Sequence, residues 1–390
     1  MKIPLSYNVR NLWTRRLTTS LTVGGIALVV FVFAAVLMLA QGIQDTLVAT
    51  GSEDNVIIIR KGSSSELLSA VSRDQISIIA AFPEVATMND GKPYGTSDMV
   101  MMTTLYKKKS KDMGNISVRG VMQSAFTMRP KVTLQEGRWF QSGLTEIVIG
   151  NKIHDQFEGV EIGQQIQIGS KFWTVVGIFD AGKTGFASEI WGDAEILMNE
   201  FNRSTTYSSF TFKLKNLNDY ETIKTKLETE QRLQDLEVKR EQQFYLEQSE
   251  MMSIFIKALG LVVTIIFSFG AMIGAMITMY AAVSNRTVEI GTLRALGFRR
   301  RSILTAFMIE SLALSLIAGI VGLSLASLMQ FVSFSTTNFG SFSELAFGFT
   351  LTPSIIISTL IFALIMGLVG GFLPAVRASR MNIINALRAA

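Results

Sequence analysis

The residues from Gly177 to Thr184 read GIFDAGKT, which fits G-x-x-x-x-G-K-[ST], the phosphate-binding loop of many nucleotide hydrolases. In such a loop, backbone N–H groups hold the phosphates, the lysine contacts them and the hydroxyl binds magnesium. The motif also requires a helix at its end, because the helix N-terminus binds the phosphate. Here Gly185 follows and no helical pattern continues the chain. We therefore interpret Gly177, Gly182, Lys183 and Thr184 as a strand and its turn, and not as a cofactor site.

The other side chains capable of chemistry do not form a recognisable site. His154 is the single histidine and there is no cysteine, which excludes a metal site built on several His or Cys ligands and a thiol nucleophile. Four lysines lie between Lys107 and Lys111. They could bind anionic head groups or a partner, but we interpret them as the tip of a hairpin. We expect no catalytic residue, no metal and no cofactor in this chain.

The hydrophobic runs indicate a membrane protein with a soluble part. Of 390 residues, 48% are hydrophobic and 17% charged, which is too apolar for an ordinary soluble enzyme and too polar for a bundle of membrane helices alone. A bilayer-spanning helix needs about 20 apolar residues, and the segments 17–40, 251–283, 303–334 and 354–373 each provide them. A signal peptide is the alternative for the first segment, but its apolar run is longer than the roughly 7–15 residues typical of one. We interpret it as a retained anchor.

Lysine and arginine beside these segments predict the orientation. The basic residues of the short flanks are Lys2, Arg10, Arg15, Arg16, Arg286, Arg294, Arg299, Arg300, Arg301, Arg377, Arg380 and Arg388. The positive-inside rule therefore places 1–16, 284–302 and 374–390 in the cytoplasm, and 41–250 and 335–353 outside. This orientation also puts the GIFDAGKT loop outside, where ATP is scarce. The basic excess follows membrane flanks and does not suggest a nucleic-acid partner.

The segment 41–250 has the pattern of an extracytoplasmic α/β domain. We expect strands at Asn55–Arg60, Glu146–Gly150, Gln165–Ile168, Phe172–Phe179 and Ser209–Leu214. Two strand–helix–strand units, the first with Ser72 as a helix N-cap, flank a β-rich subdomain at about 116–200. The helical segment at 242–257 could form a stalk that leads into the second span. The predicted fold class is thus a membrane α-helical protein with four spans in a 1+3 arrangement and this domain inserted between spans one and two.

A single acidic residue lies inside a predicted span. Glu310 is about two turns into the third span, where an unpaired carboxylate costs several kcal/mol. We expect it to face protein or a cavity, and a role in proton transfer is the alternative. The glycine pairs Gly270–Gly274 and Gly367–Gly371 have GxxxG spacing, which permits close helix approach.

The cytoplasmic segment 284–302 combines arginines with apolar residues. It reads NRTVEIGTLRALGFRRR from Asn285 to Arg301, and Val288, Leu293 and Leu296 could line one face of a short helix. Such a face could dock onto another protein. An ordinary positive-inside loop is the alternative, and it would explain the arginines but not the interleaved apolar residues.

This segment resembles the R-x-x-E-I-G-x-x-R-A-x-G coupling loop of the MacB/FtsX-like (type VII) ABC transporter permeases. The resemblance extends to Gly371-Phe-Leu-Pro374-Ala375-Val-Arg-Ala378, to Ala386-Leu387-Arg388, and to Gly120-Val121 and Glu136-Gly-Arg-Trp-Phe140. Two features differ from the family. MacB carries its ATPase fused before the first span, whereas here only a few residues precede it, so we expect no ATPase in this chain. The usual proline before Ala386-Leu387 is also missing.

The resemblance implies that the coupling loop contacts a separate cytoplasmic ATPase, which binds ATP and magnesium. The implied contact residues are Arg286, Glu289, Ile290, Gly291, Leu293, Arg294, Leu296 and Gly297. It further implies a bacterial inner-membrane location, a dimer with a second permease, either identical or paralogous, and ATP-driven movement of the external domain, termed mechanotransmission. Export, with or without a periplasmic adaptor and an outer-membrane channel, is the expected function. Lipoprotein extraction as in LolC/LolE, activation of cell-wall hydrolases as in FtsX, and a membrane-anchored receptor or enzyme remain alternatives.

Overall fold

The structure is a computed structural model that describes residues 16–338 and 341–383. The signature at Ala386-Leu387-Arg388 and the predicted N-terminal segment, except Arg16, lie outside these residues. The chain divides into two compact units. The helical unit comprises Met1–Gln41, Ile254–Val332 and Gly348–Ala390, and the sheet unit comprises Gly42–Ser253 and Ser333–Phe347.

In the part of the chain that the structure describes, five helices form the helical unit. They are α2 (Arg16–Val48), α8 (Glu241–Ser284), α9 (Thr287–Ala295), α10 (Arg300–Ser327, followed by the 3-10 turn η4, Leu328–Phe331) and α11 (Pro353–Arg380). Among the described residues, all except α9 are long and apolar enough to cross a membrane. Three of these helices extend past both ends of their predicted spans: α2 continues to Val48, α8 begins at Glu241, and α11 passes through Pro374 to Arg380. Both α2 and α8 also contribute residues to the sheet unit.

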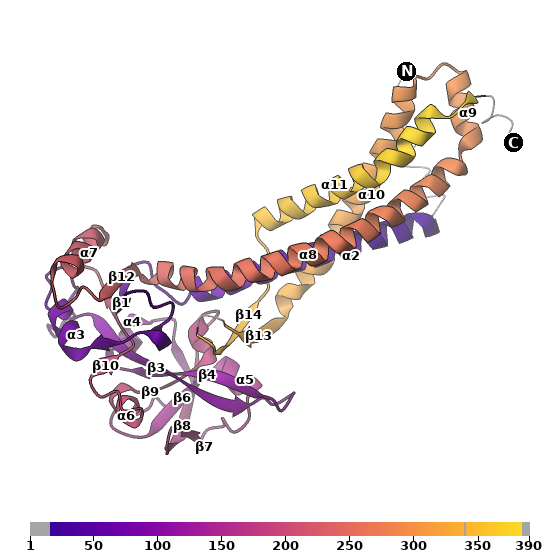
Figure 1. Ribbon diagram of the computed structural model, residues 1–390. Coiled ribbons are helices and arrows are strands. Elements are labelled where there is room, and N and C mark those ends of the chain that lie inside the picture. The colour runs from indigo at the N-terminus through magenta and orange to yellow at the C-terminus, as the bar shows by residue number, and fades with distance from the viewer. Residues whose placement is uncertain (1–15, 339–340, 384–390) are drawn as a thin grey trace. The chain divides into compact units, whose positions relative to one another are not determined.

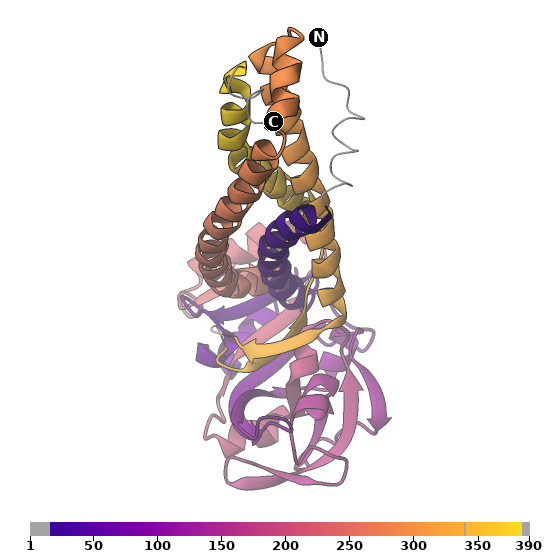
Figure 2. The same ribbon diagram turned by 90° about the vertical axis from the view of Figure 1, so that its right-hand side faces the viewer.

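Small residues let α10 and α11 approach closely, and both views show them side by side (Figures 1 and 2). The Ser311 hydroxyl on α10 donates to the Gly367 carbonyl on α11 at 2.6 Å. A Cβ added at Gly367 would lie 2.2 Å from Ser315 Oγ. The second glycine pair differs, because a Cβ added at Gly270 or Gly274 meets no described atom within 4 Å. The spacing of Gly367 and Gly371 is therefore explained by packing of α11 against α10.

One mixed sheet forms the core of the sheet unit (Figure 1). Its strands follow the order β12 (Leu236–Arg240), β1 (Asn55–Arg60), β11 (Ser209–Lys213), β3 (Gly95–Tyr106), β4 (Met113–Val121), β9 (Glu189–Asp193), β6 (Glu146–Gly150), β8 (Lys171–Asp180) and β5 (Thr133–Gly137), and β7 (Gln165–Ile168) also pairs with β8. The helices α3 (Arg73–Ala80) and α7 (Tyr220–Thr229) cover the β1 end through Ile79, Ile223 and Leu227. Ser72 caps α3 with a capping box to Gln75, as predicted.

The remaining elements are short. They are η1 (Glu66–Leu68), β2 (Val71–Ser72), α4 (Ser124–Met128), α5 (Asn151–Gln156), η2 (Gly185–Ser188), α6 (Ala194–Glu200), β10 (Thr206–Tyr207), η3 (Leu217–Asp219), β13 (Ser333–Thr337) and β14 (Glu344–Gly348). The strands β13 and β14 pair with each other in the connection between α10 and α11. Residues 333–347 of this connection belong to the sheet unit.

The long strand β3 joins the two regions that the sequence separates into a platform and a β-rich subdomain. Its first residues, Gly95–Asp98, pair with β11, whereas Met99–Tyr106 pair with β4. The predicted boundary near residue 116 falls inside β4. The hydrogen-bonded sheet is therefore continuous across it.

Candidate functional site

The predicted coupling loop folds as the short helix α9 with a defined end at each side. Arg286 is its N-cap with φ −114° and ψ 18°, so the chain leaves helical geometry between α8 and α9. At the other end, Gly297 has φ +92°, a value that favours glycine. Its N–H donates to the Arg294 carbonyl at 3.1 Å, and the Phe298 N–H donates to the Leu293 carbonyl at 3.1 Å. This pattern is a Schellman motif, which explains the glycine at this position.

The eight predicted contact residues do not all face outward. The Glu289 side chain is 53% exposed and Leu296 67%, while Leu293 and Arg294 are half-buried and Gly297 is exposed. In contrast, Ile290, Gly291 and Arg286 are buried. Ile290 packs in a cluster with residues of α8, α10 and α11. Any partner that docks on α9 as it lies here therefore meets Glu289 and Leu296 first, together with Val288 beside them.

Arg286 turns toward the helix bundle and pairs with Glu310 of α10. Its Nη1 lies 2.9 Å from Glu310 Oε2, and its Nε lies 3.2 Å from Glu289 Oε2. The guanidinium carbon also lies 5.0 Å from the centre of the Phe307 ring, a cation–π geometry. Glu310 is only 7% exposed, so the expectation that it faces protein is confirmed. Sequence inspection missed the pairing because the two residues are 24 positions apart.

The GIFDAGKT loop begins in β8 and continues as a turn. Asp180 ends the strand, and Thr184 is followed by the four-residue 3-10 turn η2. The Thr184 hydroxyl is buried and donates to the Ala181 carbonyl at 2.8 Å. Lys183 is exposed. In this described segment the helix that would bind phosphate is absent, and the hydroxyl that would bind magnesium is used within the turn.

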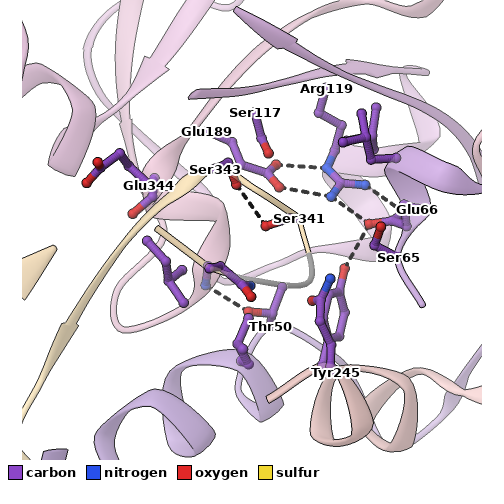
Figure 3. A pocket seen from close by; sticks show the side chains of 18 residues that line it. Thr50, Ser65, Glu66, Ser117, Arg119, Glu189, Tyr245, Ser341, Ser343 and Glu344 are labelled. Atoms are coloured by element: carbon purple, nitrogen blue, oxygen red, sulfur yellow. Dashed lines mark hydrogen bonds and ion pairs between the residues drawn. The ribbon is translucent and has the colours of Figure 1, made fainter. Parts of the chain in front are cut away.

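A buried ion cluster lies near Gly185 and Ser188, which follow this turn. Figure 3 shows three of its members, Arg119, Glu66 and Glu189. The Arg119 side chain is 3% exposed, and its guanidinium makes five hydrogen bonds of 2.8–3.0 Å to the carboxylates of Glu66, Asp98 and Glu189. An arginine has five N–H groups, so its donors are matched in number. Arg129 pairs with Asp98 from the other side. Burial alone would raise the pKa of Glu66, but the charge and hydrogen bonds of Arg119 lower it to about 2.

Segments that lead toward the spans contact this cluster or the turn beside it. The Tyr245 hydroxyl on α8 donates to Glu66 Oε2 at 3.4 Å. The hydroxyl of Thr50, just after α2, accepts from the Gly185 N–H at 2.7 Å. The hydroxyl of Ser188 accepts from the Ala346 N–H of β14 at 3.0 Å. Side chains from all three segments also line a small cavity of about 50 Å³ beside Arg119 (Figure 3).

Three of the four lysines at the predicted hairpin tip are held by acids of the sheet unit. Lys107 Nζ lies 2.7 Å from Glu344 Oε1, Lys108 pairs with Glu161 at 3.3 Å, and Lys111 pairs with Glu158. The lysines do connect β3 and β4, as a hairpin tip should. His154 is half-buried and lies 2.9 Å from Glu161. Among residues 16–338 and 341–383, no three His, Cys, Asp or Glu side chains are grouped so as to hold a metal.

Comparison with known proteins agrees with the resemblance. Residues 19–230 match the MacB-like periplasmic core domain, and residues 261–383 match the FtsX-like permease C-terminal domain. The chain is 27% identical to the macrolide export ATP-binding/permease protein MacB of Pectobacterium atrosepticum, over 87% of this chain and 56% of that protein. It is 26% identical to the pyoverdine export ATP-binding/permease protein PvdT of Pseudomonas fluorescens, over 97% of this chain and 58% of that protein.

A solved structure of the periplasmic region of MacB from Actinobacillus actinomycetemcomitans aligns with 50% of this chain and 92% of that one, with 10% identity and a TM-score of 0.38. The chain spans little more than half the length of the two curated relatives. The two domain matches, which together cover most of its length, are the finding that establishes the family. The chain is therefore a membrane protein of the MacB/FtsX-like ABC transporter permease family, with an extracytoplasmic MacB-like core domain.

Proposed function

We propose that this chain is the permease subunit of an ABC exporter that couples ATP hydrolysis by a cytoplasmic ATPase to movement of the extracytoplasmic domain. The observation that carries the proposal is α9, a short capped helix with Leu296 67% exposed between two candidate spans. An exposed leucine among arginines suits docking to a protein surface better than contact with water. The N- and C-termini and α9 then lie on the cytoplasmic side of the bacterial inner membrane, with one span before the domain and three after it.

Export is the direction that the relatives support. Two of the relatives are named for macrolide export and for pyoverdine export. We propose the same direction for this chain and leave its substrate open, since the described residues of the sheet unit present no constellation specific for one ligand. A second copy of this chain or a paralogous permease completes the transporter. A periplasmic adaptor and an outer-membrane channel could extend it across the periplasm.

The chain path supports mechanical transmission as the way in which ATP hydrolysis acts. Both α2 and α8 are continuous helices whose residues belong partly to the helical unit and partly to the sheet unit. The β13–β14 connection between α10 and α11 adds a third covalent link. Displacement of the spans would thus reach the sheet unit through three chain segments. No substrate has to pass through the helices in this scheme.

Co-purification of the full chain from its native membrane tests the proposal. We expect an ABC ATPase to copurify with the wild type and to be lost from Leu296→Asp, because a carboxylate would be placed in the apolar contact. Leu217→Asp is the matched control, since Leu217 is a 47% exposed leucine of the sheet unit. It should keep the ATPase. Absence of an ATPase from the wild type, or its full retention by Leu296→Asp, would contradict the proposal.

A further inference from the structure

We infer that Arg286 is a positioning residue that clamps the coupling helix α9 to α10 through its buried ion pair with Glu310, rather than a residue that contacts the ATPase. The inference rests on the proposed function and specifies how a displacement of α9 is passed on. It differs from the role that the family resemblance implies for Arg286.

The orientation of the side chain is the first observation. Arg286 is 5% exposed although it lies in a segment rich in exposed residues. Its guanidinium reaches Glu310 at 2.9 Å and lies over the Phe307 ring at 5.0 Å. Phe307 and Glu310 are three residues apart on α10 and therefore share one face of that helix. Arg286 thus contacts one face of α10 through an ion pair with Glu310 and a cation–π contact with Phe307.

The position of Arg286 in the chain is the second observation. It stands at the non-helical junction between α8 and α9, with φ −114° and ψ 18°. A junction of this kind can bend, so a force on α9 alone could be absorbed there without moving α8. An ion pair from the junction to α10 provides a second attachment. Ile290 of α9 also belongs to one buried apolar cluster with Ile303 and Phe307 of α10.

The location of Glu310 explains why this attachment is strong. Glu310 lies in α10, a candidate span, and is 7% exposed. A carboxylate in apolar surroundings needs a partner, and removing one partner of a buried pair leaves an uncompensated charge. Separation of α9 from α10 would therefore expose two charges to apolar surroundings. That cost keeps the helices together during movement.

The contacts beyond Glu310 indicate where the displacement goes. The next residue, Ser311, donates from its hydroxyl to the Gly367 carbonyl of α11 at 2.6 Å. Ala375 and Ala378 of α11 also belong to the cluster that contains Ile290 and Phe307. A movement of α9 is therefore passed to α10 and α11, the two helices joined by the β13–β14 connection.

The test measures the distance between α9 and α10 in the full chain bound to its ATPase in nanodiscs. Spin labels replace exposed residues, Thr292 on α9 and Ile317 on α10. We expect one narrow distance for the wild type with and without ATP, and a broad, ATP-dependent distribution for Glu310→Gln with the ATPase still bound. The charge swap R286E with E310R should restore the narrow distance. Thr305→Val, an exposed position of α10 whose hydroxyl bonds within its own helix, is the matched control and should behave as the wild type.

Each outcome bears on the clamp. A narrow distance in Glu310→Gln, or failure of the charge swap to restore it, would overturn the inference. If Glu310→Gln does not fold, Arg286→Lys keeps the charge but loses the planar guanidinium, and we expect partial broadening. Failure of the wild type to recruit an ATPase contradicts the proposed function instead, and that result is read separately from the distances.

Discussion

Two buried arginines, Arg119 in the sheet unit and Arg286 in the helical unit, serve different purposes. Arg119 is surrounded by Glu66, Asp98 and Glu189, all within one compact unit, and makes five hydrogen bonds to them. Arg286 reaches from a chain junction to Glu310 on another helix. The first arrangement stabilises the fold of the sheet unit, because three acids from different segments bind the same arginine. The second links α9 to α10, the two helices that our proposal requires to move together.

Replacement of Arg119 by methionine should have the largest effect on stability. The buried carboxylates of Glu66 and Asp98 and the half-buried carboxylate of Glu189 would lose their common cation. Breaking a buried ion pair typically costs about 3–5 kcal/mol. We expect this loss in the free energy of unfolding, measured by urea with tryptophan fluorescence, because Trp191 donates to Glu189 at 2.8 Å. Arg138→Met is the control, since Arg138 forms a half-exposed pair with Glu146, and such pairs contribute about 0–1 kcal/mol. Equal stability of the two variants would break the comparison.

Acid should weaken the sheet unit through the same cluster. The pKa of Glu66 is lowered from 4.5 to about 2, so its contribution is fully present above pH 4.5 and is lost as the pH falls toward 2. The difference corresponds to roughly 3 kcal/mol at about 1.4 kcal/mol per pKa unit. Unfolding measured from pH 7 to pH 3 should show a steeper loss for the wild type than for Glu66→Gln. Parallel curves would mean that other acids govern the acid sensitivity.

The local elements follow from the sequence, whereas the long-range pairings do not. The NVIIIR strand and the Ser72 cap depend on residues within a few positions, and both are confirmed. The pairings of Arg119 with Glu66 and of Arg286 with Glu310 join residues 53 and 24 positions apart. Nothing in the local pattern selects those partners. One signal was available: an acid inside a span requires a partner, and Arg286 is among the basic residues that precede Glu310.

The strand β3 shows a different limit of prediction. Its sequence, GTSDMVMMTTLY, lacks regular alternation of polar and apolar residues, because the strand has partners on both sides and most of its first half is buried. Periodicity therefore does not reveal it. The same applies to the β13–β14 pair, which is short and lies between two spans. Where tertiary contacts decide the structure, the sequence pattern of a single segment is insufficient.

The smallest expected effect comes from substitutions in the GIFDAGKT loop, which lies near the Arg119 cluster but takes no part in its ion pairs. Lys183 is exposed, so Lys183→Ala should leave both stability and the ATPase activity of the purified complex unchanged. The neighbouring Thr184 is buried, and its hydroxyl bonds the Ala181 carbonyl at 2.8 Å. Thr184→Val should therefore cost about 1 kcal/mol of stability, again without loss of ATPase activity. In a nucleotide-binding loop the lysine contacts the phosphates, so Lys183→Ala would reduce ATPase activity more than Thr184→Val would. Loss of ATP hydrolysis in Lys183→Ala would thus require a nucleotide role for this loop after all.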